Sequence, residues 1–331
     1  MNLRRLGSTD LLVSPIGLGL AALGRPGYIN LQHARDLKHN YDIQAMKAQT
    51  YQVLDAAWQG DVRYYDAARS YGKAEEFLGA WLKARRIPVE SVTVGSKWGY
   101  TYTAGWQVDA EVHEVKQHSL SVLRRQWQES KDNLSPYLRL YQTHSATRES
   151  GFFENQEVLQ ELGRLKRDGV VIGLTLSGAE QAGALERAME IRMDGNRLFD
   201  CVQATWNLLE PSLGDKLHQV HLEGMGVIVK EALANGRLTL RNSDPDFADK
   251  LAILVNEAER LGTTTDGLAL AAVLAQPWAD IVLSGAATPD QLESNLKALE
   301  VQWDNEAALT LSRLAEPPEI YWEKRSNLAW N

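Results

Sequence analysis

Cysteine, linker-like segments and long hydrophobic runs are scarce or missing in this sequence, and each absence narrows the class of protein. Cys201 is the only cysteine among 331 residues, so the chain has no internal disulfide, which fits a reducing cytosol. No stretch approaches the roughly 18 uninterrupted apolar residues of a membrane-spanning helix. Residues 1–5 also lack the apolar core of a signal peptide. The sequence therefore predicts a cytoplasmic protein.

Positive charge is also in deficit. The chain has 35 Lys and Arg against 43 Asp and Glu, a formal net charge of −8. This balance argues against nucleic acid or an anionic membrane as the main partner. His218 and His221 are spaced to share a helix face, but no carboxylate or thiol cluster accompanies them in the sequence. We therefore expect no metal site.

What the sequence does contain is a series of short apolar segments that alternate with amphipathic helical ones. The predicted strands span residues 16–20, 63–66, 92–97, 138–144, 171–176, 201–205, 227–230 and 281–284. Several are continuously hydrophobic, as strands buried on both faces of a parallel sheet should be. Helices are predicted over residues 45–59, 74–86, 109–132, 155–168, 179–193, 214–222, 247–261, 266–276 and 289–299.

This alternation, without a proline-rich or Gly/Ser-rich linker, predicts an α/β fold: a single (β/α)8 TIM barrel spanning residues 1–331 as one domain. Residues 3–13 resemble a β-hairpin that would plug the lower end of the barrel. Residues 25–40 are polar and lack a clear period, so we expect a long loop on the rim that carries the chemistry. Residues 17–22 also fit a loose dinucleotide-binding glycine pattern, but that pattern requires a helix, and residues 23–27 would break one.

Four polar residues lie at or beside the predicted ends of three consecutive strands. Asp66 ends the second strand, Lys97 the third and His144 the fourth. Tyr71 lies five positions after Asp66, on the loop that leads into the next helix. Because the active sites of such barrels are built at the carboxyl ends of strands, these four side chains, the polar tetrad, are expected to converge.

The residue types of the polar tetrad suit hydride transfer to a carbonyl group. That transfer leaves an alkoxide, so a proton donor must lie at its oxygen. Tyr71 would serve if Lys97 stabilised its anion and lowered a pKa that is ordinarily about 10. Asp66 would keep Lys97 charged, and a neutral His144 would orient the substrate oxygen. A structural Lys97–Asp66 ion pair with chance neighbours is the alternative interpretation.

With these residues in place, the chain resembles the aldo-keto reductase superfamily over nearly its full length, with some likeness to bacterial and sugar-oxidising members. The most specific match is residues 65–72, Tyr-Asp-Ala-Ala-Arg-Ser-Tyr-Gly, followed by residues 75–79. The resemblance places the catalytic residues of that family at Asp66, Tyr71, Lys97 and His144. It implies an oxidoreductase that moves hydride between NAD or NADP and a small carbonyl compound or its alcohol, with Tyr71 as general acid and base.

The resemblance also implies a set of residues that hold the dinucleotide. Ser177 and Gln203 would bind the nicotinamide carboxamide, residues 230–238 would cover the pyrophosphate, and residues 285–295 would hold the adenosine end. The full expected set is Gly19, Leu20, Ala21, Asp66, Ser177, Gln203, Lys230, Glu231, Leu233, Gly236, Gly285, Ala287, Gln291 and Asn295.

Three positions depart from the family pattern. Gly178 stands where the fifth-strand motif often carries asparagine, and Lys230 replaces an aromatic residue that stacks on nicotinamide in many members. Ala287 stands where many bacterial members carry an arginine for the 2′-phosphate of NADP. Because this arginine is missing, the sequence slightly favours NAD as the cofactor, or the use of both NAD and NADP.

The sequence gives less specific information about the substrate pocket than about the cofactor site. Residues 99–108 form a long loop expected to overhang the substrate, and Trp98, Tyr100 and Trp206 are expected to line its pocket. The partner would be a small carbonyl compound or a sugar. Because the loop resembles that of sugar-oxidising relatives, an NAD-dependent sugar (lactol) dehydrogenase is one alternative. A slow redox-sensing barrel that binds nicotinamide is another, which the complete polar tetrad disfavours.

Overall fold

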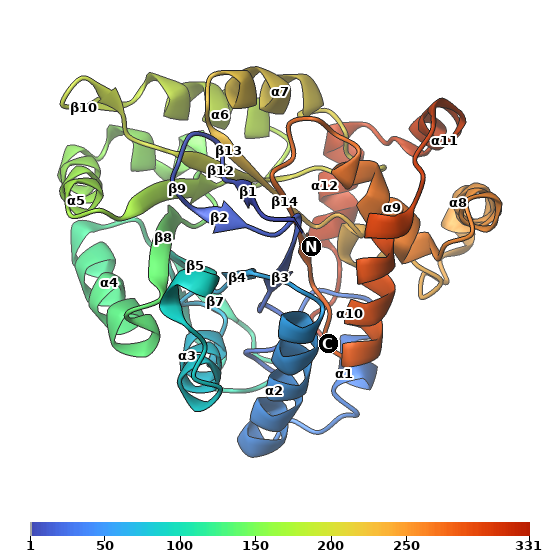
Figure 1. The fold of residues 1–331 in the computed structure, drawn as a ribbon, viewed down its shortest axis with the longest axis horizontal. Helices are drawn as coiled ribbons and strands as arrows, with labels where there is room; N and C mark the ends of the chain where they lie inside the picture. Colours follow the sequence, from blue (N-terminus) through green and yellow to red (C-terminus); the bar gives the residue numbers. More distant parts are fainter. Residues whose placement is uncertain (1) are drawn as a thin grey trace.

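In the computed structural model, which describes residues 2–331, eight parallel strands close into a barrel surrounded by helices (Figure 1). The strands are β3 Ile16–Gly19, β4 Tyr64–Asp66, β5 Thr93–Trp98, β8 Leu138–Thr143, β9 Val171–Thr175, β12 Cys201–Thr205, β13 Gly226–Lys230 and β14 Ile281–Ser284. Each strand pairs with the next, and β14 pairs with β3 to complete the circle. The predicted (β/α)8 TIM barrel is confirmed, with every strand end within one residue of its predicted position.

Helices follow the strands and cover the outside of the barrel (Figure 1). They are α1 His33–Asp36, α2 Ile43–Gln59, α3 Ala74–Ala84, α4 Leu120–Leu134, α5 Gln156–Arg167, α6 Gln181–Glu190, α7 Gly214–Leu222, α8 Ala248–Arg260, α9 Thr265–Leu274, α10 Pro289–Leu296, α11 Asn305–Leu311 and α12 Pro318–Ser326. Several helices begin at a residue whose side chain caps the helix N-terminus. Asp42 accepts hydrogen bonds from the first backbone N–H groups of α2, and Thr288 does so for α10.

The prediction of a helix over residues 109–132 was wrong in its first half. Helix α4 begins only after its cap Ser119, and the preceding chain forms β7 Glu114–Lys116. Strand β7 pairs antiparallel with β6 Tyr100–Tyr102, so the long insertion is a β-hairpin outside the barrel. Residues 192–197, expected in part as helix, form a second small hairpin of β10 Arg192–Met193 and β11 Asn196–Arg197. Cross-strand pairing overrides local helical preference at both places.

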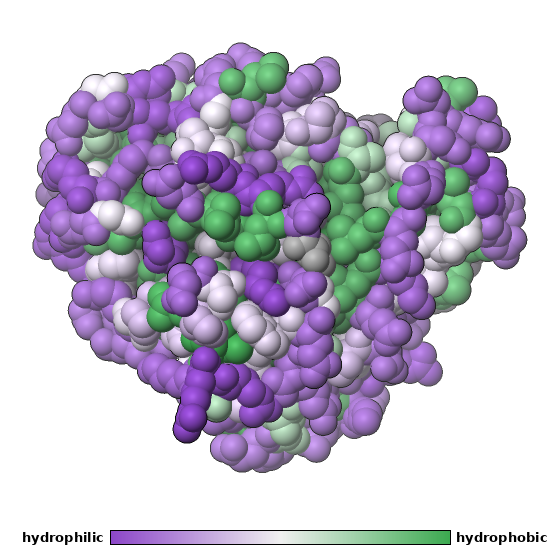
Figure 2. Space-filling model, in the orientation of Figure 1, coloured by the Kyte–Doolittle hydropathy of each residue, from purple (hydrophilic) through white to green (hydrophobic). Residues whose placement is uncertain are grey.

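The predicted N-terminal hairpin is present as β1 Arg4–Arg5 and β2 Leu12–Val13. It crosses the amino end of the barrel, which faces the viewer in Figure 1. Leu6 and Leu11 pack into one buried cluster with Tyr64, Cys201 and Ile281. From the same side, Figure 2 shows hydrophilic residues around the rim and hydrophobic ones gathered across the centre. Because this end is filled, ligand access is left to the opposite, carboxyl end.

Two features are absent from the part of the chain that the structure describes. No helix within residues 2–331 is both long and apolar enough to cross a lipid bilayer. Within the same residues, no group of three or more His, Cys, Asp or Glu side chains is arranged to hold a metal ion. His221 instead contacts Asp280, with 3.2 Å between Nε2 and Oδ1.

Candidate active site

A cavity of about 630 Å³ opens at the carboxyl ends of the barrel strands. Its walls come from the strand ends, the loop after β3, residues 230–241, the starts of α9 and α10, and the C-terminal tail. Asp66, Tyr71 and His144 all line it, so three members of the polar tetrad share one space. This size suits a ligand pocket rather than a packing defect.

The fourth member, Lys97, lies directly beneath the cavity. Its side chain is 0% exposed and forms an ion pair with Asp66, which is 2% exposed. Lys97 Nζ also donates to the backbone oxygen of Ala67 at 2.9 Å and lies 4.8 Å from the centre of the Tyr71 ring. The Tyr71 ring meets the His144 ring edge-on, with 5.6 Å between their centres. The four side chains thus form one contiguous group.

Asp66 is surrounded by neutral donors as well as by Lys97. Its Oδ1 accepts from the Tyr64 hydroxyl at 3.0 Å, from Gln142 Nε2 at 3.2 Å and from Gln203 Nε2 at 3.1 Å. A buried carboxylate requires such partners. Sequence reasoning missed Tyr64 and Gln142, although Tyr64 lies two residues before Asp66 on β4, and Gln142 lies on β8 two residues before His144. Alternate residues of a strand share a face, so this spacing was a usable signal.

Burial sets the protonation of the two groups that face the cavity. Burial and then the charge of Asp66 raise the pKa of Tyr71 above its ordinary value, so the hydroxyl keeps its proton. Burial, followed by the charges of Lys97 and Arg25, lowers the pKa of His144 well below its ordinary value, so the imidazole is neutral near pH 7. The sequence analysis expected a lowered tyrosine pKa, but the net shift is upward, because burial and the negative charge of Asp66 dominate it. Lys97 donates to Asp66 and to Ala67 rather than to the Tyr71 hydroxyl.

Several residues expected at the nicotinamide and pyrophosphate line the same cavity. They are Gly19, Ala21, Ser177, Gln203, Lys230, Glu231, Leu233 and Gly236. Lys230 Nζ donates to Thr205 Oγ1 at 2.7 Å, and burial lowers its pKa to about 8. Burial opposes the charge of Glu231, but Arg325 and Lys230 outweigh it and lower the pKa of Glu231 to about 2. Hydroxyl, amide and cationic groups thus line one side of the cavity.

The expected adenosine end contains Gly285, Gln291 and Asn295, which line the cavity, but Ala287 is fully buried outside it. The structure adds a cation that sequence reasoning missed. Arg241 lines the cavity and forms two hydrogen bonds of 2.7 Å with Asp36, which lies on α1. Asp36 also accepts from Gln291 Nε2 at 2.8 Å. Because Asp36 and Arg241 are 205 residues apart, no local pattern indicated the pair.

Three other predicted residues lie away from the cavity. Leu20 is buried in a hydrophobic cluster on the helix side of the sheet. Trp98, predicted for the pocket wall, is fully buried against His118, and Trp206 packs edge-on against Trp278. Side chains alternate along a strand, so the residue after an inward-facing one points outward. Tyr100 does line the cavity, with its ring centre 5.0 Å from that of His144.

The wall beside Tyr71 contains three residues that the sequence analysis did not single out. Arg25, Glu114 and Trp330 come from the loop after β3, from the β6–β7 hairpin and from the C-terminal tail, and all three line the cavity. The Arg25 guanidinium lies 5.2 Å from the Tyr71 ring centre and 2.8 Å from Glu114 Oε2. Only the folded chain brings these segments together.

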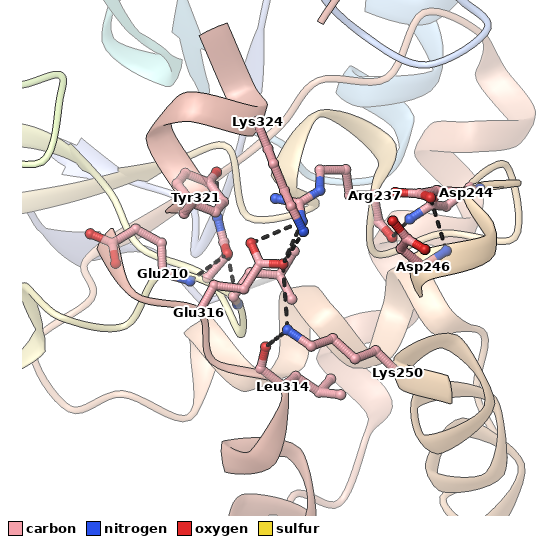
Figure 3. A network of polar contacts seen from close by, with 12 residues as sticks. Glu210, Arg237, Asp244, Asp246, Lys250, Leu314, Glu316, Tyr321 and Lys324 are labelled. Atoms are coloured by element: carbon pink, nitrogen blue, oxygen red, sulfur yellow. Dashed lines mark hydrogen bonds and ion pairs between the residues drawn. The ribbon is translucent and has the colours of Figure 1, made fainter. Parts of the chain in front are cut away.

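The C-terminal segment is held in place by a buried carboxylate. Glu316 accepts from Arg237 at 2.7 Å, from Lys324 at 3.3 Å and from Lys250 at 3.4 Å, and Figure 3 shows it between the three cations. Lys324 lies on α12 and Lys250 on α8, while Arg237 follows the loop of residues 231–236, which contributes to the cavity wall. This network fixes α12, and with it the tail, against that loop.

Comparison with known proteins identifies one family and several related oxidoreductases. The family model described as Aldo/keto reductase family matches residues 15–316. The uncharacterized oxidoreductase YqkF of Bacillus subtilis is 26% identical over 98% of this chain and 100% of its own. The NADH-specific methylglyoxal reductase of Escherichia coli is 26% identical over 95% of this chain and 98% of its own.

Among solved structures, aldo-keto reductase AKR11C1 from Bacillus halodurans, in its holo form, has the same fold. It superposes with a TM-score of 0.71 at 22% identity, over 96% of this chain and 97% of that one. The family model, the matching barrel and the polar groups gathered at its carboxyl end agree with one another. The chain belongs to the aldo/keto reductase family and is an NAD(P)-dependent oxidoreductase.

Proposed function

We propose that this enzyme transfers hydride between a nicotinamide cofactor and a small aldehyde or ketone, or the corresponding alcohol, with Tyr71 as general acid and base. The observation that carries the proposal is the contiguous group of Asp66, Lys97, Tyr71 and His144 at one cavity. Tyr71 holds its proton and His144 is neutral, the two states that carbonyl reduction requires.

Each member has a separate task in this mechanism. The bound cofactor supplies hydride to the carbonyl carbon. His144 would donate a hydrogen bond to the carbonyl oxygen and orient it, and the Tyr71 hydroxyl would give that oxygen its proton as negative charge develops. The Lys97 ammonium, 4.8 Å from the Tyr71 ring centre, would stabilise the phenolate that remains. Asp66 positions Lys97 rather than the substrate.

The lining of the cavity fits a nicotinamide dinucleotide. Gln203 Nε2 already donates to Asp66, which leaves its amide oxygen to accept from the nicotinamide carboxamide. Ser177 would supply a hydroxyl to the same group, and residues 230–236 would lie along the pyrophosphate. Gly285, Gln291 and Asn295 would hold the adenosine end.

For cofactor choice, we propose that NADH is used at least as well as NADPH. Selection of the 2′-phosphate needs a free cation, ideally a bidentate arginine. Arg241 is the cation that the structure offers here, and both of its terminal nitrogens, Nη1 and Nη2, donate to Asp36. The Escherichia coli relative, named as NADH-specific, supports the same lean.

One experiment tests the activity itself. The purified protein is assayed with aldehydes, ketones and free sugars in one direction and with alcohols and sugars in the other, with each cofactor, by nicotinamide absorbance. We expect steady turnover with at least one carbonyl compound. Stoichiometric oxidation of bound cofactor without further turnover would instead support the slow redox-sensing alternative.

A further inference from the structure

The cavity wall beside Tyr71 carries charge that hydride transfer does not use. Arg25 pairs with Glu114 at 2.8 Å, and Arg325 pairs with Glu231 at 2.6 Å. All four residues line the cavity, together with the aromatic rings of Tyr28, Tyr100 and Trp330. Pairs of opposite charge at a substrate wall provide donors and acceptors side by side, which an alkyl or aryl substrate could not use.

Arg25 is the most constrained member of this wall. Its side chain is 3% exposed, and Nη1 donates to Glu114 and to the backbone oxygen of Ser70 at 3.0 Å. Its Nε is buried and has no hydrogen-bond partner. Because Nε is closed off from solvent, a ligand in the cavity would meet the terminal Nη groups of Arg25 instead.

Trp330, from the C-terminal tail, completes this part of the cavity wall. Its ring lies 4.7 Å from the Arg25 guanidinium and stacks on the His113 ring, with 3.9 Å between the ring centres. The backbones of Tyr28 and Asn331 exchange two hydrogen bonds of 3.2 Å. The tail, the loop after β3 and the β6–β7 hairpin therefore meet next to Tyr71, with α12 anchored by the Glu316 network (Figure 3).

We propose that Arg25, Glu114 and Trp330 form a substrate subsite that binds hydroxyl groups next to the reacting carbonyl, so that the substrates are small polyhydroxylated aldehydes or ketones. This inference rests on the proposed function. A hydroxyl group can donate to the Glu114 carboxylate and accept from an Arg25 N–H, while the neighbouring C–H groups of the substrate contact the edge of the Trp330 ring. A carboxylated substrate would accept from Arg25 but would meet the negative charges of Glu114 and Glu231.

A matched set of four-carbon aldehydes tests the subsite: butanal, erythrose and succinic semialdehyde. We expect the wild type to have its highest kcat/KM with erythrose. Glu114→Gln should lower the ratio of kcat/KM for erythrose to that for butanal by about tenfold, because a neutral amide oxygen accepts a weaker hydrogen bond than a carboxylate. The loss should be mainly in KM. Glu111→Gln, on the exposed part of the same loop, is the matched control.

A second measurement does not depend on turnover. Erythritol titrated into the enzyme–NADH complex should bind to the wild type and about tenfold more weakly to Trp330→Leu. This variant also keeps the test open if Glu114→Gln fails to fold. Equal kcat/KM for butanal and erythrose, or the highest kcat/KM with succinic semialdehyde, would overturn the subsite while leaving the proposed function intact. No turnover of any aldehyde with either cofactor would instead overturn the proposed function.

Discussion

At the scale of single residues, burial decides what Tyr71 can do. Because burial and the charge of Asp66 keep its hydroxyl protonated, Tyr71 could donate a proton to the alkoxide in the proposed mechanism. We expect Tyr71→Phe to lower kcat by about 10²–10⁴, the usual contribution of general acid catalysis. The ring remains, so the cofactor Kd measured by fluorescence titration should be unchanged. Tyr51→Phe on the outer helix α2 is the control, and a Tyr71→Phe enzyme with most of its kcat would contradict the assignment.

Lys97 has a catalytic role in the proposed mechanism, and its buried ion pair with Asp66 also makes it structurally important. Lys97→Met leaves Asp66 buried without its cation, although Tyr64, Gln142 and Gln203 still donate to it. Removing one partner of a buried ion pair typically costs about 3–5 kcal/mol, and the neutral donors place the expected loss at the lower end. Urea unfolding should show that loss together with lost activity. The double change Lys97→Met with Asp66→Asn should restore stability but not turnover, and a fully active single variant would exclude Lys97 from the site.

At the scale of elements, α1 and the loop after β13 meet through Asp36 and Arg241. We expect Asp36→Asn to release the Arg241 guanidinium and to raise kcat/KM for NADPH relative to NADH by about tenfold, the gain expected from one charge-assisted hydrogen bond. The assay is the ratio of kcat/KM for the two cofactors. Ala287→Arg should give less, because Ala287 is fully buried and outside the cavity. A wild-type preference for NADPH above about a hundredfold, roughly 2.7 kcal/mol, would contradict the lean toward NADH.

At the scale of the whole molecule, buried neutral histidines make stability depend on pH. Burial lowers the pKa of His33 to about 4 and of His118 to about 4, and lowers that of His144 well below its ordinary value. The unfolded chain then binds more protons than the folded one below an ordinary histidine pKa of about 6.5. The free energy of unfolding should therefore fall as the pH drops from about 6.5 toward 4, by up to about 1.4 kcal/mol per pH unit for each histidine.

Urea unfolding at a series of pH values checks this dependence. His33→Leu should reduce the slope of stability against pH, because His33 is fully buried and its burial disfavours the protonated form in the folded state. His39→Gln changes an exposed histidine and should leave the slope unaltered. An unchanged slope in His33→Leu would show that His33 is protonated equally in both states.

The sequence by itself determined the barrel and the polar tetrad. Both depend on short-range patterns: continuous apolar strands, helical periodicity between them, and polar residues at strand ends. Asp66, Lys97 and His144 end successive parallel strands, and adjacent strands lie side by side, so order along the chain was enough to bring them together. The position of Tyr71 in the same group could be predicted because it lies only five residues after Asp66 in the sequence.

Only the tertiary structure decided which residues form the cavity wall beside Tyr71 and which lie at the expected adenosine end of the cavity. Arg25, Glu114 and Trp330 come from three segments far apart in the chain, and so do Asp36, Arg241 and Gln291. Strand β7 was predicted as helix and β6 as loop, because the pairing between the two strands leaves little trace in local periodicity. Loops take their positions from contacts with other loops and from the tail, and those contacts exist only in the closed barrel.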